Sequence, residues 1–295
     1  MATLTLFLES LSPNSPKHAT VVLQRTSSFG LTGSFTQISF TPIERPEDDA
    51  ASDFILVRST LQNDATKSTL DVVIKATLLR RCEYEIALET KAYENHANAL
   101  AGLIPEFHGL YVEGPNAIVQ CLITQYCGEP LPTAFSLLPL GLRWKIVRQV
   151  LKMHEELGLH HLALFERNIL REATTGNIYF IDLRMLRPHQ CKRKLRIKAG
   201  CIHPSPDEVD YDELYKLVTK MQLWASNCVD FWGEPMFLHA LGSAEDVMAM
   251  YPKYKITSED QRKQMLVEAE VFLENVVIPL ESPPITECLA SEDVL

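Results

Sequence analysis

Residues 158–184, GLHHLALFERNILREATTGNIYFIDLR, form the stretch from which the fold of this chain is predicted. Two short apolar segments, residues 168–170 and 178–181, flank the polar turn formers TTGN, which is a β-hairpin pattern. Asn168 enters the first arm, and Asp182 follows the second arm 14 residues later. Because the outer ends of antiparallel arms lie close together, we expect Asn168 and Asp182 to share one divalent cation through their oxygens.

The same stretch resembles the catalytic loop of the protein-kinase-like superfamily, H-x-D-x-x-x-x-N followed by a hairpin and D-F-G. His161 stands at the histidine position, Asn168 at the asparagine position and residues 182–184 (DLR) at D-F-G. Ala163 stands where the catalytic aspartate belongs. The loop sequence FERNIL is most similar to that of the divergent kinase-like proteins abundant in basidiomycete fungi. The resemblance implies that the metal ligands, Asn168 and Asp182, are kept and that the catalytic base is missing.

Length and composition set outer limits on the class of protein. The 295 residues suit two domains or one bilobed fold, and 46% hydrophobic residues suffice for a sizeable core. A net charge of −10 argues against a general nucleic-acid binder, which is usually basic. Seven scattered cysteines without a C-x-x-C pair indicate reduced thiols in the cytoplasm or nucleus. The sequence lacks both a basic leader and an apolar run of about 20 residues, so we expect no membrane association.

The first 125 residues are predicted to be rich in β-strands, because apolar or β-branched segments alternate with turn formers. The glycine-bearing loop at residues 27–34 is predicted to be an ordinary hairpin turn. Gly33 precedes Lys75 by 42 residues, which is too far for the phosphate loop of a kinase. The predicted strands cover residues 19–24, 36–40, 54–57, 70–78, 104–111 and 117–125.

Lys75 lies within the β-branched run of residues 70–78 and follows V-V-I, as the lysine does in V-A-I-K of kinases. Taken alone, the run is also consistent with an edge strand whose lysine reaches solvent. Residues 81–100 are predicted to be a helix, and Glu89 stands in E-x-x-x-Y, where related kinase-like proteins carry the glutamate that pairs with the lysine. Glu85 is the second choice for this role, and a solvated glutamate is the alternative.

The second half is predicted to be mainly helical. Apolar residues at spacings of three and four predict helices over residues 140–157 and 207–224, and Ser258-x-x-Gln261 is a capping-box pattern. The basic run at residues 192–198 is predicted to be a solvated loop, with docking of an acidic partner as the alternative. Further helices are predicted at residues 236–250 and 258–276, and a disordered, acidic, proline-rich tail at residues 279–295.

Several residues carry predicted roles around a nucleotide. Tyr126 and Cys127 resemble the hinge between kinase lobes, where backbone groups take the edge of adenine. His161 is expected to hold the loop backbone, and Glu166, the only acid between His160 and Asn168, is a weak substitute for the missing base. Arg184 replaces the glycine of D-F-G, which indicates a static site or a direct contact with phosphate.

The resemblance implies an α+β, bilobed protein-kinase-like fold with a β-rich N-lobe (residues 1–125) and a shortened, mainly helical C-lobe (residues 126–278). It further implies a pseudokinase that binds ATP with Mg²⁺ through Lys75, Glu89 and the two metal ligands and acts through a protein partner. Two alternatives stay open at this point. One is a slow phosphotransferase acting on a protein or a small molecule, and the other is a structural interaction module with no nucleotide.

Overall fold

The computed structural model describes residues 2–7, 11, 20–43, 54–77, 83–114, 119–190, 212–224, 228–237 and 241–277. The chain divides into two compact units, and each is described by itself. The first unit combines residues 1–134 with 148–190, and the second combines residues 135–147 with 191–295. The basic run at residues 192–198 and the predicted tail at residues 279–295 lie outside the described residues.

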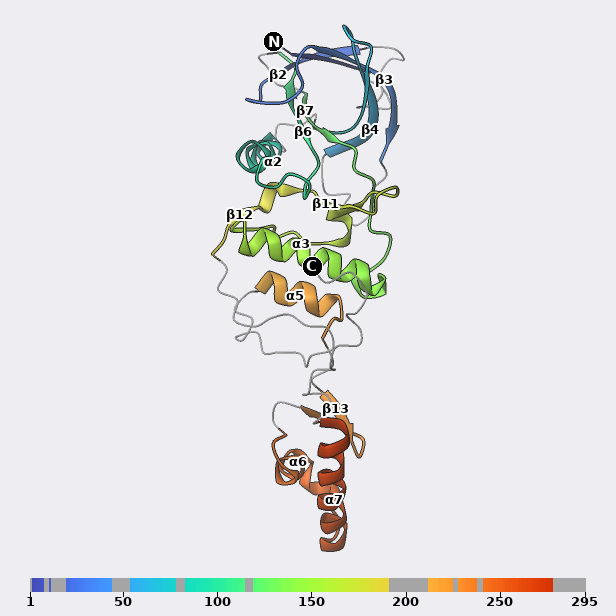
Figure 1. Ribbon diagram of the computed structural model, residues 1–295, viewed down its shortest axis with the longest axis vertical. Helices are drawn as coiled ribbons and strands as arrows, with labels where there is room; N and C mark the ends of the chain where they lie inside the picture. Colours follow the sequence, from blue (N-terminus) through green and yellow to red (C-terminus); the bar gives the residue numbers. More distant parts are fainter. Residues whose placement is uncertain are drawn as a thin grey trace. The chain divides into compact units, whose positions relative to one another are not determined.

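Seven strands of the first unit form a closed barrel in the order β1-β2-β6-β7-β5-β4-β3 (Figure 1). Neighbouring strands are antiparallel except for β1 and β3, whose parallel pairing closes the barrel. The strands are β1 (Thr3–Phe7), β2 (Thr20–Arg25), β3 (Ser34–Pro42), β4 (Phe54–Asn63), β5 (Thr69–Thr77), β6 (Phe107–Val112) and β7 (Gln120–Gln125).

The core of the first unit lies inside this barrel, because side chains alternate between the two faces of each strand. Along β5, Val72, Ile74 and Ala76 are fully buried in the cluster to which every strand contributes. Val73 and Lys75 therefore point to the outer face of the barrel. This alternation places the functional side chains outside the barrel wall.

The closure of the barrel depends on β1, which the sequence did not reveal as a strand. Residues 3–5 pair in parallel with residues 34–36, and the backbone N–H of Phe7 donates to Oε1 of Gln37 at 2.9 Å. The buried Gln37 in turn donates to the hydroxyl of Ser59 at 2.6 Å. These bonds satisfy polar groups that would be costly to bury unpaired.

The prediction of a bilobed protein-kinase-like fold with a mainly helical C-lobe is wrong. The structure has a closed seven-stranded barrel, and five α-helices have both ends within the described residues. The parallel pairing of β1 with β3 closes the strands of the predicted β-rich region into a barrel. The helices are α2 (Glu83–His96), α3 (Leu140–Glu155), α5 (Asp212–Lys220), α6 (Ala244–Met250) and α7 (Glu259–Phe272). Helix α2 lies between barrel strands β5 and β6 in the chain, and the other helices follow the barrel together with small sheets.

The glycine-bearing loop at residues 27–34 is not a hairpin turn, because β1 lies between β2 and β3 in the barrel. The loop instead contacts helix α2 and strand β6. The backbone N–H and the hydroxyl of Ser28 both donate to Glu94 at 2.7 Å, and the N–H of Leu110 donates to the hydroxyl of Ser27 at 3.0 Å.

The predicted hairpin of residues 168–181 is confirmed as the antiparallel pair β10 (Ile169–Arg171) and β11 (Ile178–Phe180). Strand β8 (Glu129–Pro130) adds to β10, so the segment that leaves the barrel is tied to the hairpin. A second small pair, β9 (Leu159–His160) with β12 (Arg187–Pro188), brackets the same stretch.

In the second unit, α6 and α7 share an apolar cluster around Val247 and Met265. The N-cap half of the predicted capping box is confirmed, because the hydroxyl of Ser258 accepts the N–H of Gln261 at 3.1 Å. The side chain of Gln261 accepts the N–H of Thr257 at 2.8 Å and not that of Ser258. The helix predicted at residues 236–250 is wrong in its first part, where β14 (Glu234–Phe237) pairs with β13 (Cys228–Phe231). None of the helices in the described parts of the chain is both long and apolar enough to cross a membrane.

Candidate functional site

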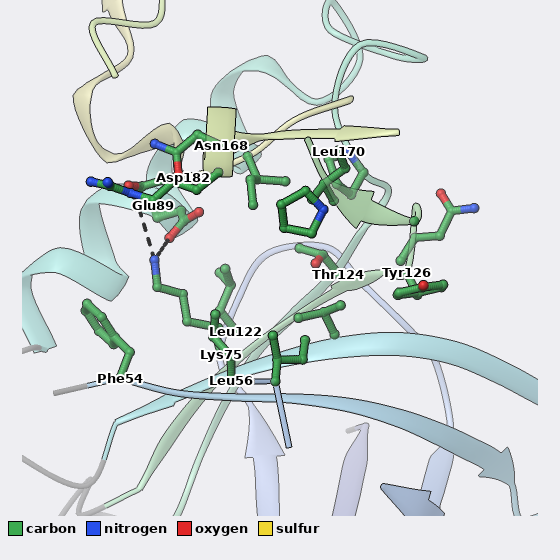
Figure 2. Close-up of a pocket in the computed structure, with 18 of the residues that line it drawn as sticks. Phe54, Leu56, Lys75, Glu89, Leu122, Thr124, Tyr126, Asn168, Leu170 and Asp182 are labelled. Carbon is green, nitrogen blue, oxygen red and sulfur yellow. Dashed lines mark hydrogen bonds and ion pairs between the residues drawn. The ribbon is translucent and has the colours of Figure 1, made fainter. Parts of the chain in front are cut away.

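A cavity of about 210 Å³ lies between the outer face of the barrel and the β10–β11 hairpin, within the first unit (Figure 2). Its volume is somewhat below the range of roughly 300–1,000 Å³ typical of small-molecule sites. One end is mainly apolar and the other carries the charged cluster, and Gln125, Glu129 and Arg167 also line the cavity. The apolar end includes Leu56, Val73, Leu122, Pro130 and Leu170, and the polar end includes Lys75, Glu89, Asn168, Asp182 and Arg184.

Lys75 reaches the polar end because it points outward from a central strand. Strand β5 is paired on one side with β4 and on the other with β7, so the alternative of an edge strand is wrong. The Nζ of Lys75 lies 2.6 Å from Oε2 of Glu89 on helix α2, as predicted from the strand followed by a helix. Figure 2 shows this ion pair at the charged end of the cavity. The two side chains are only 14% and 4% exposed, so each charge needs the other.

Asp182 follows β11 and lies beside this ion pair. Its backbone is left-handed (φ 63°, ψ 59°), a conformation that aspartate tolerates better than most residues. Burial alone would raise the pKa of its carboxyl, but hydrogen bonds from Arg184 and the charge of Lys75 lower that pKa below its usual value. The carboxylate is therefore ionised at neutral pH, 3.8 Å from Nζ of Lys75.

Asn168 is buried next to Asp182, at the end of a short 3₁₀ turn, Glu166–Asn168. Its amide nitrogen Nδ2 donates to the backbone carbonyl of Ala163 at 2.9 Å. This bond fixes the orientation of the amide, so the oxygen Oδ1 is the atom of Asn168 that can serve a ligand. The hairpin therefore brings Asn168 and Asp182 together, as the sequence predicted.

His161 holds the loop that carries Ala163, at the position where the sequence resemblance expects the catalytic aspartate. The N–H of Ala163 donates to Nδ1 of His161 at 3.3 Å, and Nε2 lies 2.9 Å from the carbonyl of Ile181. These partners assign the neutral tautomer with the proton on Nε2. The fully buried His161 thus connects the loop to the residue that precedes Asp182. Ala163 places only a methyl group at the position of the base.

Glu166, the weak substitute for the base, is not among the residues that line the cavity. Its backbone carbonyl accepts the N–H of Leu131 at 3.3 Å, and its neighbour Arg167 lines the cavity instead. The arrangement therefore gives no support to Glu166 as an acceptor of the substrate proton.

The predicted hinge segment lies beside the apolar end of the cavity. Tyr126 lines the cavity, but its N–H donates to the carbonyl of Asp71 at 3.1 Å and is therefore occupied. Cys127 is 2% exposed and is not a lining residue, and burial raises the pKa of its thiol to about 12. The sequence also gave no sign that the guanidinium of Arg58 would cover the Tyr126 ring at 3.7 Å.

Arg184 binds the carboxylate of Asp182, which was predicted to bind a metal ion. Its Nε and Nη2 donate to the two different oxygens of Asp182, with Nη2 at 2.9 Å from Oδ2, while Nη1 pairs with Glu85 of helix α2. Both oxygens of the carboxylate are therefore bonded to a guanidinium, which carries a permanent positive charge. In this arrangement the residues present do not fit a Mg²⁺ ion bound by Asn168 and Asp182.

No protein-family model matches the sequence, and the sequence has no significant match among curated proteins. The class of protein is therefore inferred from the cavity itself. The cavity combines apolar walls with a buried lysine–glutamate pair and an ionised aspartate.

Proposed function

We propose that this chain binds a nucleotide in the cavity and does not transfer its phosphate, so that it acts as a pseudokinase through a protein partner. The observation that carries the proposal is the convergence of Lys75, Glu89 and Asp182 beside a loop that has Ala163 in place of the base. The proposal rests on this set of residues and not on a bilobed fold, which the structure does not have.

The apolar end suits a nucleobase. Leu56, Val73 and Leu122 project from three barrel strands on one side, and Leu170 projects from the hairpin on the other. A planar ring placed between them would leave water and gain roughly 25 cal/mol for each Å² of apolar surface buried. Thr124, which also lines the cavity, supplies a hydroxyl for a polar edge of the ring.

The polar end suits phosphate. An ammonium group has three N–H donors, and the Nζ of Lys75 donates one hydrogen bond to Glu89 at 2.6 Å. Asp182 lies farther away, at 3.8 Å, so Nζ retains donors for a phosphate oxygen. Glu89 fixes the direction of the lysine side chain before the ligand arrives, which reduces the entropic cost of binding.

Phosphate transfer is not expected, because Ala163 places only a methyl group at the position where the resemblance expects the catalytic base. A positioned base contributes on the order of 10²–10⁴-fold to the rate. Ala163 cannot accept a proton, and neither Glu166 nor His161 lines the cavity. The slow phosphotransferase is therefore the second candidate.

Thermal unfolding with and without adenine nucleotides tests binding. A ligand at 100 times its Kd adds about 2.7 kcal/mol to the stability of the folded state. We expect ADP and ATP to raise the Tm of the wild-type chain and Lys75→Met to abolish the increase, with circular dichroism confirming that the variant folds. An unchanged Tm with every nucleotide would reject the proposal and favour the structural interaction module.

Transfer of the γ-phosphate is measured in parallel. We expect no turnover above background in the wild type and a detectable rate in Ala163→Asp, where a carboxylate is restored. Robust wild-type turnover that Ala163→Asp leaves unchanged would show that the missing base is irrelevant and that the second candidate is correct.

A further inference from the structure

Arg184 binds both oxygens of the Asp182 carboxylate, which a divalent cation would need as a ligand. It lies two residues after Asp182, in the 3₁₀ turn Leu183–Met185, and the left-handed backbone of Asp182 directs the guanidinium back over the carboxylate. The two nitrogens Nε and Nη2 bind different oxygens of Asp182, which is the bidentate arrangement preferred by arginine and carboxylate. Arg184 is 28% exposed and Asp182 is 19% exposed, so water screens this pair only partly.

A third bond holds the guanidinium in this position. Nη1 of Arg184 pairs with Glu85 one turn before Glu89 on helix α2. The same helix thus positions both cations of the site, Lys75 through Glu89 and Arg184 through Glu85. The link does not depend on a bound ion.

Mg²⁺ requires nearly octahedral oxygen ligands at about 2.0–2.1 Å and usually takes one or two carboxylates. The carboxylate predicted to bind the cation together with Asn168 is that of Asp182. The guanidinium of Arg184, which is permanently charged, already lies against both of its oxygens. A cation at the same oxygens would be repelled by the guanidinium. The Mg²⁺ implied by the sequence resemblance therefore has no suitable place while Arg184 holds Asp182.

Arg184 also retains two N–H donors. A guanidinium carries five N–H groups, and the bonds to Asp182 and Glu85 use three of them. Arg184 lines the cavity together with Lys75, so the two cations border the same polar end. Lysine and arginine N–H groups are the usual protein partners of phosphate oxygens.

We infer that Arg184, together with Lys75, takes the place of the divalent cation, so that this cavity binds a nucleotide without any metal ion. The inference rests on the proposed function, because it concerns the phosphate end of the same cavity. It makes Arg184 the residue that determines metal independence. Removal of the guanidinium would free the Asp182 carboxylate and create a site that depends on a divalent cation.

The experiment uses the full chain, freed of metal with EDTA, and measures the Kd of ADP by calorimetry with EDTA or with Mg²⁺. ADP is the probe because three carboxylates of the cluster face only two cations, which disfavours the more highly charged ATP. We expect wild-type affinity in EDTA to equal that in Mg²⁺ within about twofold. Arg184→Gln should lose about tenfold or more in EDTA and regain part of it in Mg²⁺.

Mn²⁺ alone, followed by electron paramagnetic resonance, gives a readout that does not need the nucleotide. We expect the wild type not to bind Mn²⁺ and Arg184→Gln to bind it through Asp182. Arg171→Ala, which removes an exposed arginine that does not line the cavity, is the matched control and should behave as wild type. If Arg184→Gln does not fold, Glu85→Gln weakens the same link, and Mn²⁺ binding by that variant is the alternative readout.

The outcomes separate the two proposals. The role of Arg184 is overturned if the wild type binds ADP at least tenfold more tightly in Mg²⁺ than in EDTA. It is also overturned if the wild type binds Mn²⁺ through Asp182. Either result leaves the proposal of nucleotide binding intact. The absence of ADP binding under both conditions overturns the proposed function and, with it, the metal-independent site.

Discussion

The ammonium group of Lys75 lies 2.6 Å from the carboxylate of Glu89, and this pair joins strand β5 of the barrel to helix α2. Both side chains are largely withdrawn from water. The pair therefore has a structural role that is independent of any ligand, because a buried charge without its partner is expensive.

Removal of one partner of this pair should destabilise the first unit. We expect Lys75→Met to lose about 3 kcal/mol, because Glu89 would remain buried and unpaired. The double variant Lys75→Met, Glu89→Leu should recover most of the loss, because two apolar side chains need no partner. Urea unfolding of the wild type, both single variants and the double variant measures the coupling. Equal losses in the single and double variants would contradict a buried, coupled pair.

The backbone at Gly128 should not tolerate a side chain. Its φ is +105°, and a Cβ there would lie 2.2 Å from the carbonyl oxygen of Arg171. We expect Gly128→Ala to cost about 3 kcal/mol or more, because backbone atoms of the hairpin would have to shift. Gly176→Ala is the matched control: its φ is also positive (+67°), but nothing lies within 4 Å of the added atom. That variant should cost only about 1 kcal/mol.

Thermal unfolding of the two glycine variants distinguishes close packing from backbone strain alone. Equal losses at Gly128 and Gly176 would mean that the approach of the hinge segment to the hairpin contributes nothing to stability.

Leu162 has a left-handed backbone (φ 60°) in the loop before Ala163, and its side chain is 44% exposed. A left-handed residue with a side chain costs roughly 1–2 kcal/mol, whereas glycine adopts this conformation freely. We expect Leu162→Gly to raise the free energy of unfolding by up to about 1 kcal/mol after the greater entropy of unfolded glycine is deducted.

The control for Leu162 is Leu137→Gly, which changes a leucine that is 74% exposed and has no positive φ. That change should destabilise by about 0.5–1 kcal/mol. A loss of similar size in Leu162→Gly would show that the loop conformation carries no strain.

His108 should make stability depend on pH. Burial lowers the pKa of this 2% exposed histidine below 6.5, and Glu106, 3.9 Å away, opposes the shift only in part. As the pH falls below 6.5, His108 becomes protonated in the unfolded chain while it is still neutral in the folded chain. Stability should therefore fall with pH, by up to about 1.4 kcal/mol per unit, until the folded state is protonated as well.

Urea unfolding between pH 7.5 and 5 measures this slope, and His108→Gln should reduce it. An identical slope in the wild type and in the variant would assign the pH dependence to other groups.

Sequence reasoning succeeded where partners are close along the chain or follow in a simple order. The approach of Asn168 to Asp182 follows from one hairpin, and the pairing of Lys75 with Glu89 follows from a strand and the next helix. It failed at β1 because a five-residue strand becomes recognisable only through its neighbours, and β3 lies about 30 residues away.

The position of the Arg184 guanidinium could not be read from the sequence either. It depends on the left-handed backbone of Asp182 and on Glu85, 99 residues earlier. The spacing of D-L-R indicated that the glycine was replaced, but not that the replacement would hold the aspartate. The kinase resemblance therefore pointed to residues that do lie around one cavity, and it implied the wrong architecture.

Closure of the barrel limits how a protein partner can attach. Each of the seven strands has a neighbour on both sides over part of its length, so no strand of the barrel is open along a whole edge. A strand added to the barrel could pair only with a short segment, and a partner of the barrel would mainly contact side chains on its outer wall. The short sheets, such as the β13–β14 hairpin, have open outer edges.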